Sequence, residues 1–431
     1  ADILFPSGLL MQDSVLKKLQ AILLEIQEED QSIPVEILGW LYQYYNSEKK
    51  DEVFAGLKKN QKVTKENIPA ATQLFTPHWI VKYMVENSLG KLILEYIPNM
   101  ESIKKDWNYY IETEIESSSE KLSIEGIKIL DPAMGSGHML TYAFDILFDV
   151  YQELGWSKKE SVLSILQNNL YGLEIDDRAG QIAAFALLMK GKEKFPRLFQ
   201  VLEREENFEM PVISLQESNA ISKRMYTMLE ESPTLQDLLK GFENAKEYGS
   251  ILKIDSFAES ILQEEYQKLQ EKIQNQGQFS LLKNNEFLEG DLEEDLERLE
   301  RIIRQYKIMI QKYDVVITNP PYMGGRGFSP KLKNYTEKNY KDSKSDLFSV
   351  FMEVCQGFTK KNRYTAMITM QSWMFLSSFE TLRNHMITKT EIQTLNHLGT
   401  RAFSELAGEV VQTVSWVQKH KTPEKKGTYI R

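Results

Sequence analysis

The chain has 431 residues, of which 42% are hydrophobic and 26% charged, an ordinary globular composition that excludes a disordered or collagen-like protein. Its 62 acidic and 52 basic side chains give a formal net charge of -10, so nucleic-acid binding would need a local basic patch. The single cysteine, Cys355, excludes an internal disulfide and the usual thiolate zinc site, and favours a reducing compartment.

The sequence lacks the marks of a secreted or membrane protein. It does not open on a charged segment followed by an apolar stretch, and its longest apolar run, 182–189, is far shorter than the roughly 18–20 residues that cross a bilayer. The first residue is not methionine, and a strand pattern at 428–430 stands just before the last residue. We therefore expect a cytoplasmic protein with no membrane partner, and a chain that is part of a longer one.

Helical periodicity marks the first part of the chain. Apolar residues three and four apart over 13–27 predict an amphipathic helix, and the pattern continues over 35–45 and 51–59. A loop is predicted at 65–71. We therefore expect a helical N-terminal module over residues 1–70.

The tripeptide Phe75-Thr76-Pro77 predicts the start of another helix. Thr76 is the expected N-cap and Pro77 the first helical residue, where a missing amide hydrogen costs nothing. A stripe of apolar residues follows at roughly helical spacing: Ile80, Met84, Leu89, Leu92 and Ile93. The polar stretch 112–121 then predicts a surface loop before the first strand.

Strand and helix patterns then alternate, with one interruption. The expected strands are 127–130, 170–173, 212–215, 313–318, 366–369 and 410–417, and the first two are followed by expected helices at 139–147 and 178–189. Between the expected strands 212–215 and 313–318, the segment 221–311 is acidic, rich in glutamine and without a strand pattern, which predicts a helical insertion. The alternation predicts an α/β fold with a mostly parallel sheet, divided by the insertion into the parts 71–220 and 312–431.

A glycine-rich turn follows the first strand. Gly135 and Gly137 have no Cβ, so the backbone there can approach a ligand closely. The spacing lacks the third glycine of the dinucleotide fingerprint and the lysine of a P-loop, so the turn alone does not identify the ligand. Glu174 ends the second strand, where an acidic side chain can hold both hydroxyls of a ribose. Together these features predict a nucleoside ligand, although each alone also has a purely structural explanation.

The sequence Asn319-Pro320-Pro321-Tyr322 directly follows the fourth expected strand. Proline stops the strand and stiffens the turn, whose carbonyl groups no longer serve the sheet. The Asn319 side-chain oxygen and the Pro320 carbonyl could both accept hydrogen bonds from one planar amino group, while Tyr322 supplies a face for a flat ring. The turn therefore predicts recognition of an exocyclic amine on a heterocycle.

These motifs resemble those of a known enzyme family. DPAMGSGHML from Asp131 and NPPY from Asn319 are similar to the S-adenosyl-L-methionine (AdoMet) and catalytic motifs of amino-methyltransferases. The order FTP, DPAMGSG, NPPY is similar to that of the gamma-class DNA adenine-N6 methyltransferases. Longer stretches resemble one branch, the PglX methyltransferases of BREX phage-resistance systems. These stretches are ATQLFTPHWIVKYMVENSLG from Ala71, NPPYMGG from Asn319, SKSDLFSVFME from Ser343, SWMFLSSFETLR from Ser372 and NHLGTRAFSELAGEVVQT from Asn396.

The resemblance implies a Rossmann-like class I AdoMet-dependent methyltransferase fold and AdoMet as cofactor. It assigns to the cofactor pocket Thr76, Asp131, Pro132, Ala133, Gly135, Gly137, Glu174 and Ile175. It assigns to the target adenine Asn319, Pro320, Pro321 and Tyr322. Three residues stay open as the contact to the amine of the cofactor's own adenine: Gln216, Glu217 and Asp291. Met139 departs from the family pattern, because many relatives have phenylalanine there. PglX proteins are longer than this chain, so we expect the region that recognises the DNA sequence to lie outside it.

A segment rich in basic and aromatic residues follows the NPPY turn. Its aromatic residues are Phe328, Tyr335 and Tyr340. We predict a loop that contacts DNA phosphates through Arg326, Lys331, Lys333, Lys338, Lys341 and Lys344, with a merely solvated surface as an equal alternative.

Three further side chains are interpreted as structural. Trp373 and Phe375 are expected in the core, in preference to a contact with the target base. The five histidines lack the spacing of metal ligands, and His138 is expected to start a helix. No metal is therefore predicted.

The implied reaction is methyl transfer from AdoMet to the N6 amine of an adenine flipped out of double-stranded DNA. The amine lone pair is delocalised into the ring, so we expect two acceptors and in-line positioning, and no strong base, to drive the reaction. Other phage-defence proteins are the further implied partners. Two alternatives stay open: a protein glutamine methyltransferase, whose planar amide substrate would also suit NPPY, and a non-catalytic scaffold or DNA-binding subunit of a defence complex.

Overall fold

The computed structural model describes most of the chain from residue 61 onward. The described residues are 61–72, 74–113, 115, 118–205, 208–281, 289–400, 402–403 and 412–431, together with scattered positions between 39 and 59. The helix predicted at 13–27 lies outside the described residues, as does most of 35–45 and 51–59. Among the described residues no helix is both long and apolar enough to cross a membrane.

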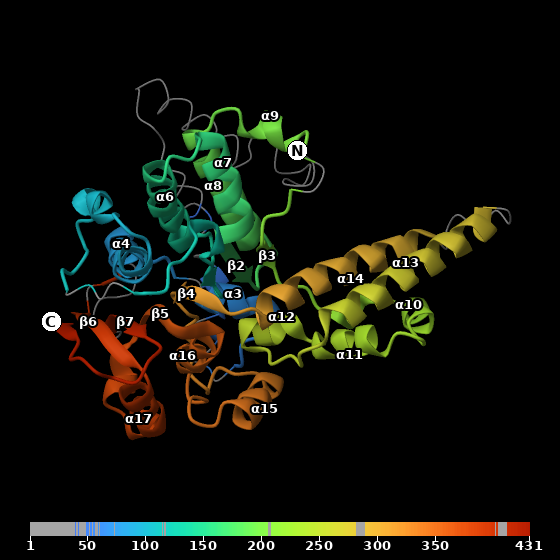
Figure 1. Ribbon diagram of the computed structural model, residues 1–431. Helices are drawn as coiled ribbons and strands as arrows, with labels where there is room; N and C mark the ends of the chain where they lie inside the picture. Colours follow the sequence, from blue (N-terminus) through green and yellow to red (C-terminus); the bar gives the residue numbers. More distant parts are fainter. Residues whose placement is uncertain are drawn as a thin grey trace, which may run out of the picture.

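An eight-stranded sheet with the order β3-β2-β1-β4-β5-β7-β6-β8 forms the centre of the protein (Figure 1). The strands are β1 Ile129–Asp131, β2 Leu170–Glu174, β3 Val212–Ser214, β4 Tyr313–Thr318, β5 Thr359–Met370, β6 Glu391–Gly399, β7 Thr413–Lys419 and β8 Thr428–Ile430. Strands β1 to β5 are parallel to one another, β7 is antiparallel to β5 and β6, and β8 is parallel to β6. The expected α/β fold with a mostly parallel sheet is therefore confirmed.

The predicted strands are all present, and β4 has the predicted bounds. One strand, β6, was missed. Its sequence EIQTLNHLG carries polar residues at buried and half-buried positions, so it lacks the apolar run by which the other strands were found. The sheet, and not the side-chain pattern, makes this segment a strand, because β7 and β8 pair with it on both sides.

Helices cover both faces of the sheet. Val315 and Ile317 of β4 belong to one hydrophobic cluster, with side chains from α4 and α6, whereas Val316 belongs to a second cluster with side chains from α16. The helices are α3 Ile68–Thr72, α4 His78–Val85, α5 Lys91–Tyr96, α6 His138–Glu153, α7 Lys158–Ser164, α8 Asp177–Lys194, α9 Leu198–Leu202, α10 Lys223–Met228, α11 Pro233–Gly241, α12 Ala245–Tyr248, α13 Glu259–Leu281, α14 Glu289–Ile310, α15 Pro330–Asn339, α16 Leu347–Phe358 and α17 Glu380–Lys389.

Two local predictions near the start of the described region were wrong. The predicted loop 65–71 is helical, formed by a 3-10 turn at Lys65–Asn67 and by α3, because proline in the first turn of a helix gives up no hydrogen bond. The N-cap of α4 is Pro77 and not Thr76, since the carbonyl of Pro77 accepts the first helical hydrogen bonds, from Ile80 and Val81. The apolar stripe predicted for this segment is fully buried.

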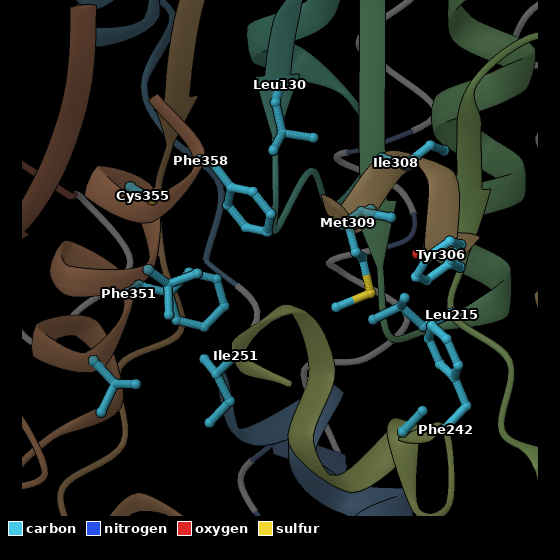
Figure 2. Close-up of a cluster of buried hydrophobic side chains, with 14 of the residues drawn as sticks. Leu130, Leu215, Phe242, Ile251, Tyr306, Ile308, Met309, Phe351, Cys355 and Phe358 are labelled. Carbon is cyan, nitrogen blue, oxygen red and sulfur yellow. The ribbon is translucent and has the colours of Figure 1, made fainter. Parts of the chain in front are cut away.

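The described part of the segment between β3 and β4 contains helices joined by loops and no strand, as predicted. Helices α13 and α14 form a long pair that projects away from the sheet, and α10 and α11 pack below it (Figure 1). The base of this insertion is part of the main core. Figure 2 shows Phe242 and Tyr306 of the insertion in one cluster with Leu130 of β1 and Phe351 of α16. The insertion is therefore packed onto the sheet at its base and free of it at its far end.

A buried ion pair fixes the beginning of β4 against β5. Asp314 is 1% exposed, and its carboxylate accepts hydrogen bonds from the Arg363 Nε at 2.9 Å and the Lys360 Nζ at 2.7 Å. The Arg363 guanidinium is also buried and lies 4.2 Å from the ring centre of Tyr96. Charges that are taken out of water are stable only with such full pairing.

Replacing Arg363 by methionine should lower the free energy of unfolding by about 3–5 kcal/mol, because the buried Asp314 carboxylate loses its buried partner. The matched control is Lys360→Met, which removes the more exposed partner of the same carboxylate and should cost at most about 1 kcal/mol. Urea unfolding at pH 7 measures both losses. Equal, small losses would contradict the assignment of this pair as the anchor of β4.

Candidate functional site

A cleft opens at the carboxyl ends of β1, β2 and β4. Chain order reverses between β1 and β4, and such switch points are where parallel α/β sheets bind ligands. The cleft encloses about 1030 Å³, its open mouth included. Nine of the predicted site residues line it: Thr76, Asp131, Pro132, Ala133, Gly135, Glu174, Ile175, Asn319 and Pro321.

The glycine turn after β1 is shaped by two left-handed residues. Gly135 and Gly137 have φ values of 55° and 87°, which side chains rarely allow. A Cβ on Gly135 would meet no atom within 4 Å, and this residue lines the cleft. A Cβ on Gly137 would lie 3.1 Å from the Cβ of Ala183, so Gly137 serves the packing of α6 against α8 and does not line the cleft.

Glu174 holds the floor of the cleft together. Its carboxylate accepts hydrogen bonds from the backbone N–H groups of Gly135 at 2.8 Å, Ile175 at 2.9 Å and Asp176 at 3.0 Å. A carboxylate has about four acceptor positions. One position therefore remains for a ligand hydroxyl, where the sequence predicted that Glu174 would hold two. Burial raises the pKa of Glu174 to about 7.

Asp131 links the two halves of the site. Its Oδ1 accepts hydrogen bonds from the Thr318 hydroxyl at 2.7 Å and from the Ala133 N–H at 3.1 Å, so the end of β1 is bonded to the end of β4. These bonds leave Oδ2 to accept a further hydrogen bond from a ligand. Burial raises the pKa of Asp131 to about 7.

The NPPY turn is held by its own side chains. The Asn319 amide donates from Nδ2 to the Leu74 carbonyl at 3.0 Å, and its Oδ1 accepts from the Tyr322 hydroxyl at 2.7 Å. The Tyr322 hydroxyl also lies 3.0 Å from the Ile368 carbonyl on β5. These contacts point Oδ1 in one defined direction and leave it a second lone pair for a ligand.

The start of α16 supports the same turn. Asp346 is the N-cap of this helix, and its Oδ1 accepts from the backbone N–H groups of Met323 at 3.2 Å and Phe348 at 3.3 Å. The Leu347 N–H donates to the Met323 carbonyl at 3.0 Å. Burial raises the pKa of Asp346 to about 6. The stretch SKSDLFSVFME therefore anchors the turn that follows β4.

Some predicted site residues lie elsewhere. Pro320 and Tyr322 do not line the cleft; Pro320 is buried, and Tyr322 packs at the edge of the core, its ring 6.3 Å from that of Phe348. Gln216 and Glu217 do not line it either: the Gln216 amide is bonded to Asp177, and Glu217 pairs with Lys65 at 2.5 Å. Asp291 belongs to α14, but its side chain lies outside the described part of the structure.

The sequence missed one wall of the cleft, which the helical insertion supplies. Glu247, Tyr248, Gly249 and Ser250 line it, and the Ser250 hydroxyl donates to the Pro132 carbonyl in the glycine turn. Gly249 has a φ of 62°, but its sequence context carries no signal for a turn that meets a distant segment. The position of this wall follows from tertiary packing alone.

The expected basic loop is mostly a helix, α15, with Ser329 as N-cap and Pro330 at its first position. All six predicted basic residues are exposed. The three aromatic residues are not part of the surface patch: Phe328 and Tyr340 are buried, and the Tyr335 ring stacks on Tyr248 at 4.3 Å. They bind α15 to the insertion, so that the aromatic side chains face the protein and the lysines face solvent.

The structure separates the two aromatic residues that were expected in the core. Trp373 is buried, as expected, with its Nε1 donating to the Thr369 hydroxyl at 2.9 Å. Phe375 was wrongly predicted and is 67% exposed, because the chain turns outward after the short helical segment Gln371–Met374.

No group of three or more potential metal ligands occurs among the described residues. His138 starts α6, as predicted, and its Nδ1 lies 2.9 Å from the Ser136 hydroxyl. Its ring lines the cleft, where it meets the Phe75 ring edge to face at 4.8 Å. Burial lowers the pKa of His138 to about 4, so the ring is neutral at pH 7.

The strand order, with β7 antiparallel, and the cleft at the switch point define the fold as that of class I AdoMet-dependent methyltransferases. The side chains present fit this cofactor, because Asp131 and Glu174 offer hydrogen-bond acceptors to a cleft with apolar walls. The Eco57I restriction-modification methylase family matches residues 168–403, and the chain belongs to it.

Curated relatives extend the likeness over nearly the whole chain. The adenine-specific methyltransferase BrxX of Escherichia coli O9:H4 (strain HS) is 37% identical, with 97% of this chain and 36% of that protein covered. The adenine-specific methyltransferase PglX of Lacticaseibacillus casei (strain Zhang) is 40% identical, with 94% and 34% covered. The chain thus spans about a third of the length of these relatives.

Among solved structures, a nuclease-deletion mutant of the Type ISP restriction-modification enzyme LlaGI, in complex with a DNA substrate mimic, matches at 15% identity and a TM-score of 0.44. The match covers 99% of this chain and 30% of that one. The fold assignment therefore rests on the strand order and not on this likeness.

The raised pKa of Glu174 gives a testable pH dependence. The folded protein favours the protonated carboxyl, so this stability is complete below about pH 4.5 and is lost as the pH rises through 7. The loss should reach about 3 kcal/mol. In the Glu174→Gln variant the side chain cannot ionise, so the fall in the free energy of unfolding from about pH 4.5 to above pH 7 should be smaller by about this amount. This difference does not depend on how stable the variant is at any one pH. Urea unfolding at a series of pH values tests this, and an unchanged slope would refute it.

Proposed function

We propose that this chain transfers a methyl group from AdoMet to the N6 amine of adenine in DNA. The observation that carries the proposal is the side-by-side position of the glycine turn and Asn319 in one cleft. Membership in a restriction-modification methylase family supports it, as do two relatives named adenine-specific methyltransferases.

The cofactor side of the cleft would be held by groups that the fold already orients. The one remaining acceptor position of Glu174 would take a ribose hydroxyl, and Gly135 would let the backbone approach the ligand. Thr76 and the free Oδ2 of Asp131 would contact polar groups further along the same ligand. When bound, AdoMet supplies an electrophilic methyl group on a sulfonium.

Asn319 would act on the other reactant. Its Oδ1 has one lone pair engaged by the Tyr322 hydroxyl and a second one available to an N6 hydrogen. The Pro320 carbonyl would accept the other hydrogen, provided that this buried residue, which does not line the cleft here, is exposed to the substrate. Two acceptors localise the amine lone pair and aim it at the methyl group. In-line positioning of this kind can supply up to roughly 7–11 kcal/mol of the barrier, so no strong base is needed.

Tyr322 would serve in two ways. Its hydroxyl orients Asn319, as the 2.7 Å contact indicates. Its ring does not line the cleft in this structure and would have to turn toward it to stack on the flipped adenine. Stacking is worth about 1–3 kcal/mol and would offset much of the cost of taking the base out of the duplex. The hydroxyl role was absent from the sequence prediction, which considered the ring alone.

The exposed lysines of α15 would hold the DNA backbone. Between residues 326 and 344 there are six basic and two acidic side chains, in a chain whose formal net charge is -10. The segment begins four residues after the NPPY turn, and α15 packs beside the wall of the cleft through Tyr335. Phosphate contacts at this place would position a duplex over the cleft.

Asn319→Ala should reduce methyl transfer to DNA at least about 100-fold, since the loss of the acceptor that orients the amine costs a few kcal/mol of transition-state stabilisation. AdoMet affinity, measured by calorimetry, should stay within about threefold, because Asn319 is placed on the amine side of the cleft. The matched control, Asn334→Ala, removes an exposed asparagine of α15 and should have little effect.

The assay uses AdoMet with a labelled methyl group and unmethylated genomic DNA, with a glutamine-containing peptide mixture in parallel. Label in the peptides and none in the DNA would establish the glutamine methyltransferase alternative. Wild-type turnover by Asn319→Ala would overturn the assignment of this residue.

Replacing Lys331, Lys338 and Lys341 together by alanine should weaken DNA binding and reduce the salt dependence of the affinity, because about three phosphate contacts are lost. The control replaces three exposed lysines far from the cleft, Lys121, Lys158 and Lys159, and keeps the net charge equal. Fluorescence anisotropy with a labelled duplex at several salt concentrations gives both slopes. Identical slopes for the two triple variants would exclude α15 and the segment after it from the DNA contact.

A further inference from the structure

Two large apolar side chains stand next to each other on the surface after β5. Phe375 is 67% exposed and Leu376 is 54% exposed; no other large hydrophobic side chain in the described parts of the chain is more exposed than Phe375. Single exposed apolar residues are common, but two adjacent ones at one tip cost solubility without a folding benefit. Their exposure therefore calls for a functional explanation.

The tip is held rigidly by the residues around it. The Phe375 and Leu376 N–H groups both donate to the Ser372 carbonyl, at 3.2 and 3.0 Å. The Arg383 guanidinium of α17 donates to the carbonyls of Trp373 at 2.8 Å and Leu376 at 2.7 Å. Trp373 itself is anchored in the core. The two side chains are thus presented outward by a braced turn.

The tip lies at the same edge of the sheet as the NPPY turn. Strands β4 and β5 are parallel neighbours, so both segments leave the sheet at its carboxyl edge. A chain of ring contacts joins them: Tyr322 lies 6.3 Å from Phe348, which lies 5.8 Å from Phe379. The Phe379 N–H in turn donates to the Leu376 carbonyl at 3.2 Å.

The tip and the basic helix lie on the same side of the protein. In Figure 1, α17, which braces the tip, and α15, which carries three of the lysines, both lie below the sheet, with α16 between the two helices. A duplex held by α15 over the cleft would therefore extend toward the tip.

We propose that Phe375 and Leu376 form a wedge that enters the duplex at the step from which the target adenine is flipped. The wedge rests on the proposed function, because it needs a base that leaves the stack. Flipping exposes the faces of the neighbouring base pairs and costs a few kcal/mol. An apolar side chain inserted between base steps covers these faces and keeps the base from returning.

The test compares the wild-type chain with the double variant Phe375→Ser, Leu376→Ser. The wild-type chain is first incubated with unmethylated genomic DNA and AdoMet, and the modified adenine is located by sequencing. Two synthetic duplexes of that site are then used: one with thymine opposite the target adenine, and one with an abasic site there, which weakens the stack in advance. The control variant is Ile387→Ser, which replaces a 57% exposed side chain of α17.

The double variant should methylate the matched duplex about 10- to 100-fold more slowly than wild type, which corresponds to about 1.4–2.7 kcal/mol. On the abasic duplex the loss should shrink to less than about threefold. The Ile387→Ser control should match wild type on both. AdoMet affinity and thermal unfolding should agree among all three proteins, which excludes a folding defect.

A second readout does not depend on the chemical step. With 2-aminopurine in place of the target adenine, the wild-type chain should raise the fluorescence as the base leaves the stack, and the double variant should raise it less. Equal rate losses on both duplexes, or no loss, would overturn the wedge while methylation by the wild type upholds the proposed function. If the wild type modifies no adenine at all, the proposed function falls and the wedge with it.

Discussion

One buried hydrogen bond, from the Thr318 hydroxyl to the Asp131 carboxylate, joins the two halves of the site. The residues are 187 positions apart in the chain, yet they end neighbouring parallel strands whose register pairs Ile129 with Val315. The glycine turn and the NPPY turn start from these two strand ends. Their separation is therefore set by the spacing between strands, about 4.8 Å, and not by either loop. A site built in this way tolerates large insertions, provided that the strands still pair.

The insertion between β3 and β4 illustrates that tolerance. Long connections add little entropic cost, because the cost of closing a loop grows only slowly with its length. This connection also contributes to the core, since Phe242 and Tyr306 pack with side chains of β1 and α16. It supplies a wall of the cleft as well, through Ser250 and its neighbours. The sheet and the insertion are thus interdependent, although hydrophobic patterning in the sequence separates them clearly.

Local chemistry explains what could be predicted from the sequence. The glycine turn and NPPY were found because each combines a backbone requirement with a functional group in a few adjacent residues. The wall at Gly249 was missed because its contact with the glycine turn, through Ser250 and the Pro132 carbonyl, depends on the path of the whole insertion. Tyr335 was misplaced on the surface although Ser329-Pro330 signals a helix start, from which the inward face can be read. Phe375 was misplaced because an aromatic side chain alone does not reveal which way a turn faces.

The stacking of Tyr335 on Tyr248 would couple the binding of a small molecule in the cleft to the binding of a polyanion at α15. Tyr248 belongs to the wall of the cleft and Tyr335 to the lysine-bearing helix, and Ser329 at the start of that helix donates to Glu247 in the same wall. Under the proposed function, a displacement of the helix by a polyanion would therefore change the shape of the small-molecule compartment. By thermodynamic reciprocity, occupancy of that compartment would then alter the affinity for the polyanion by the same factor.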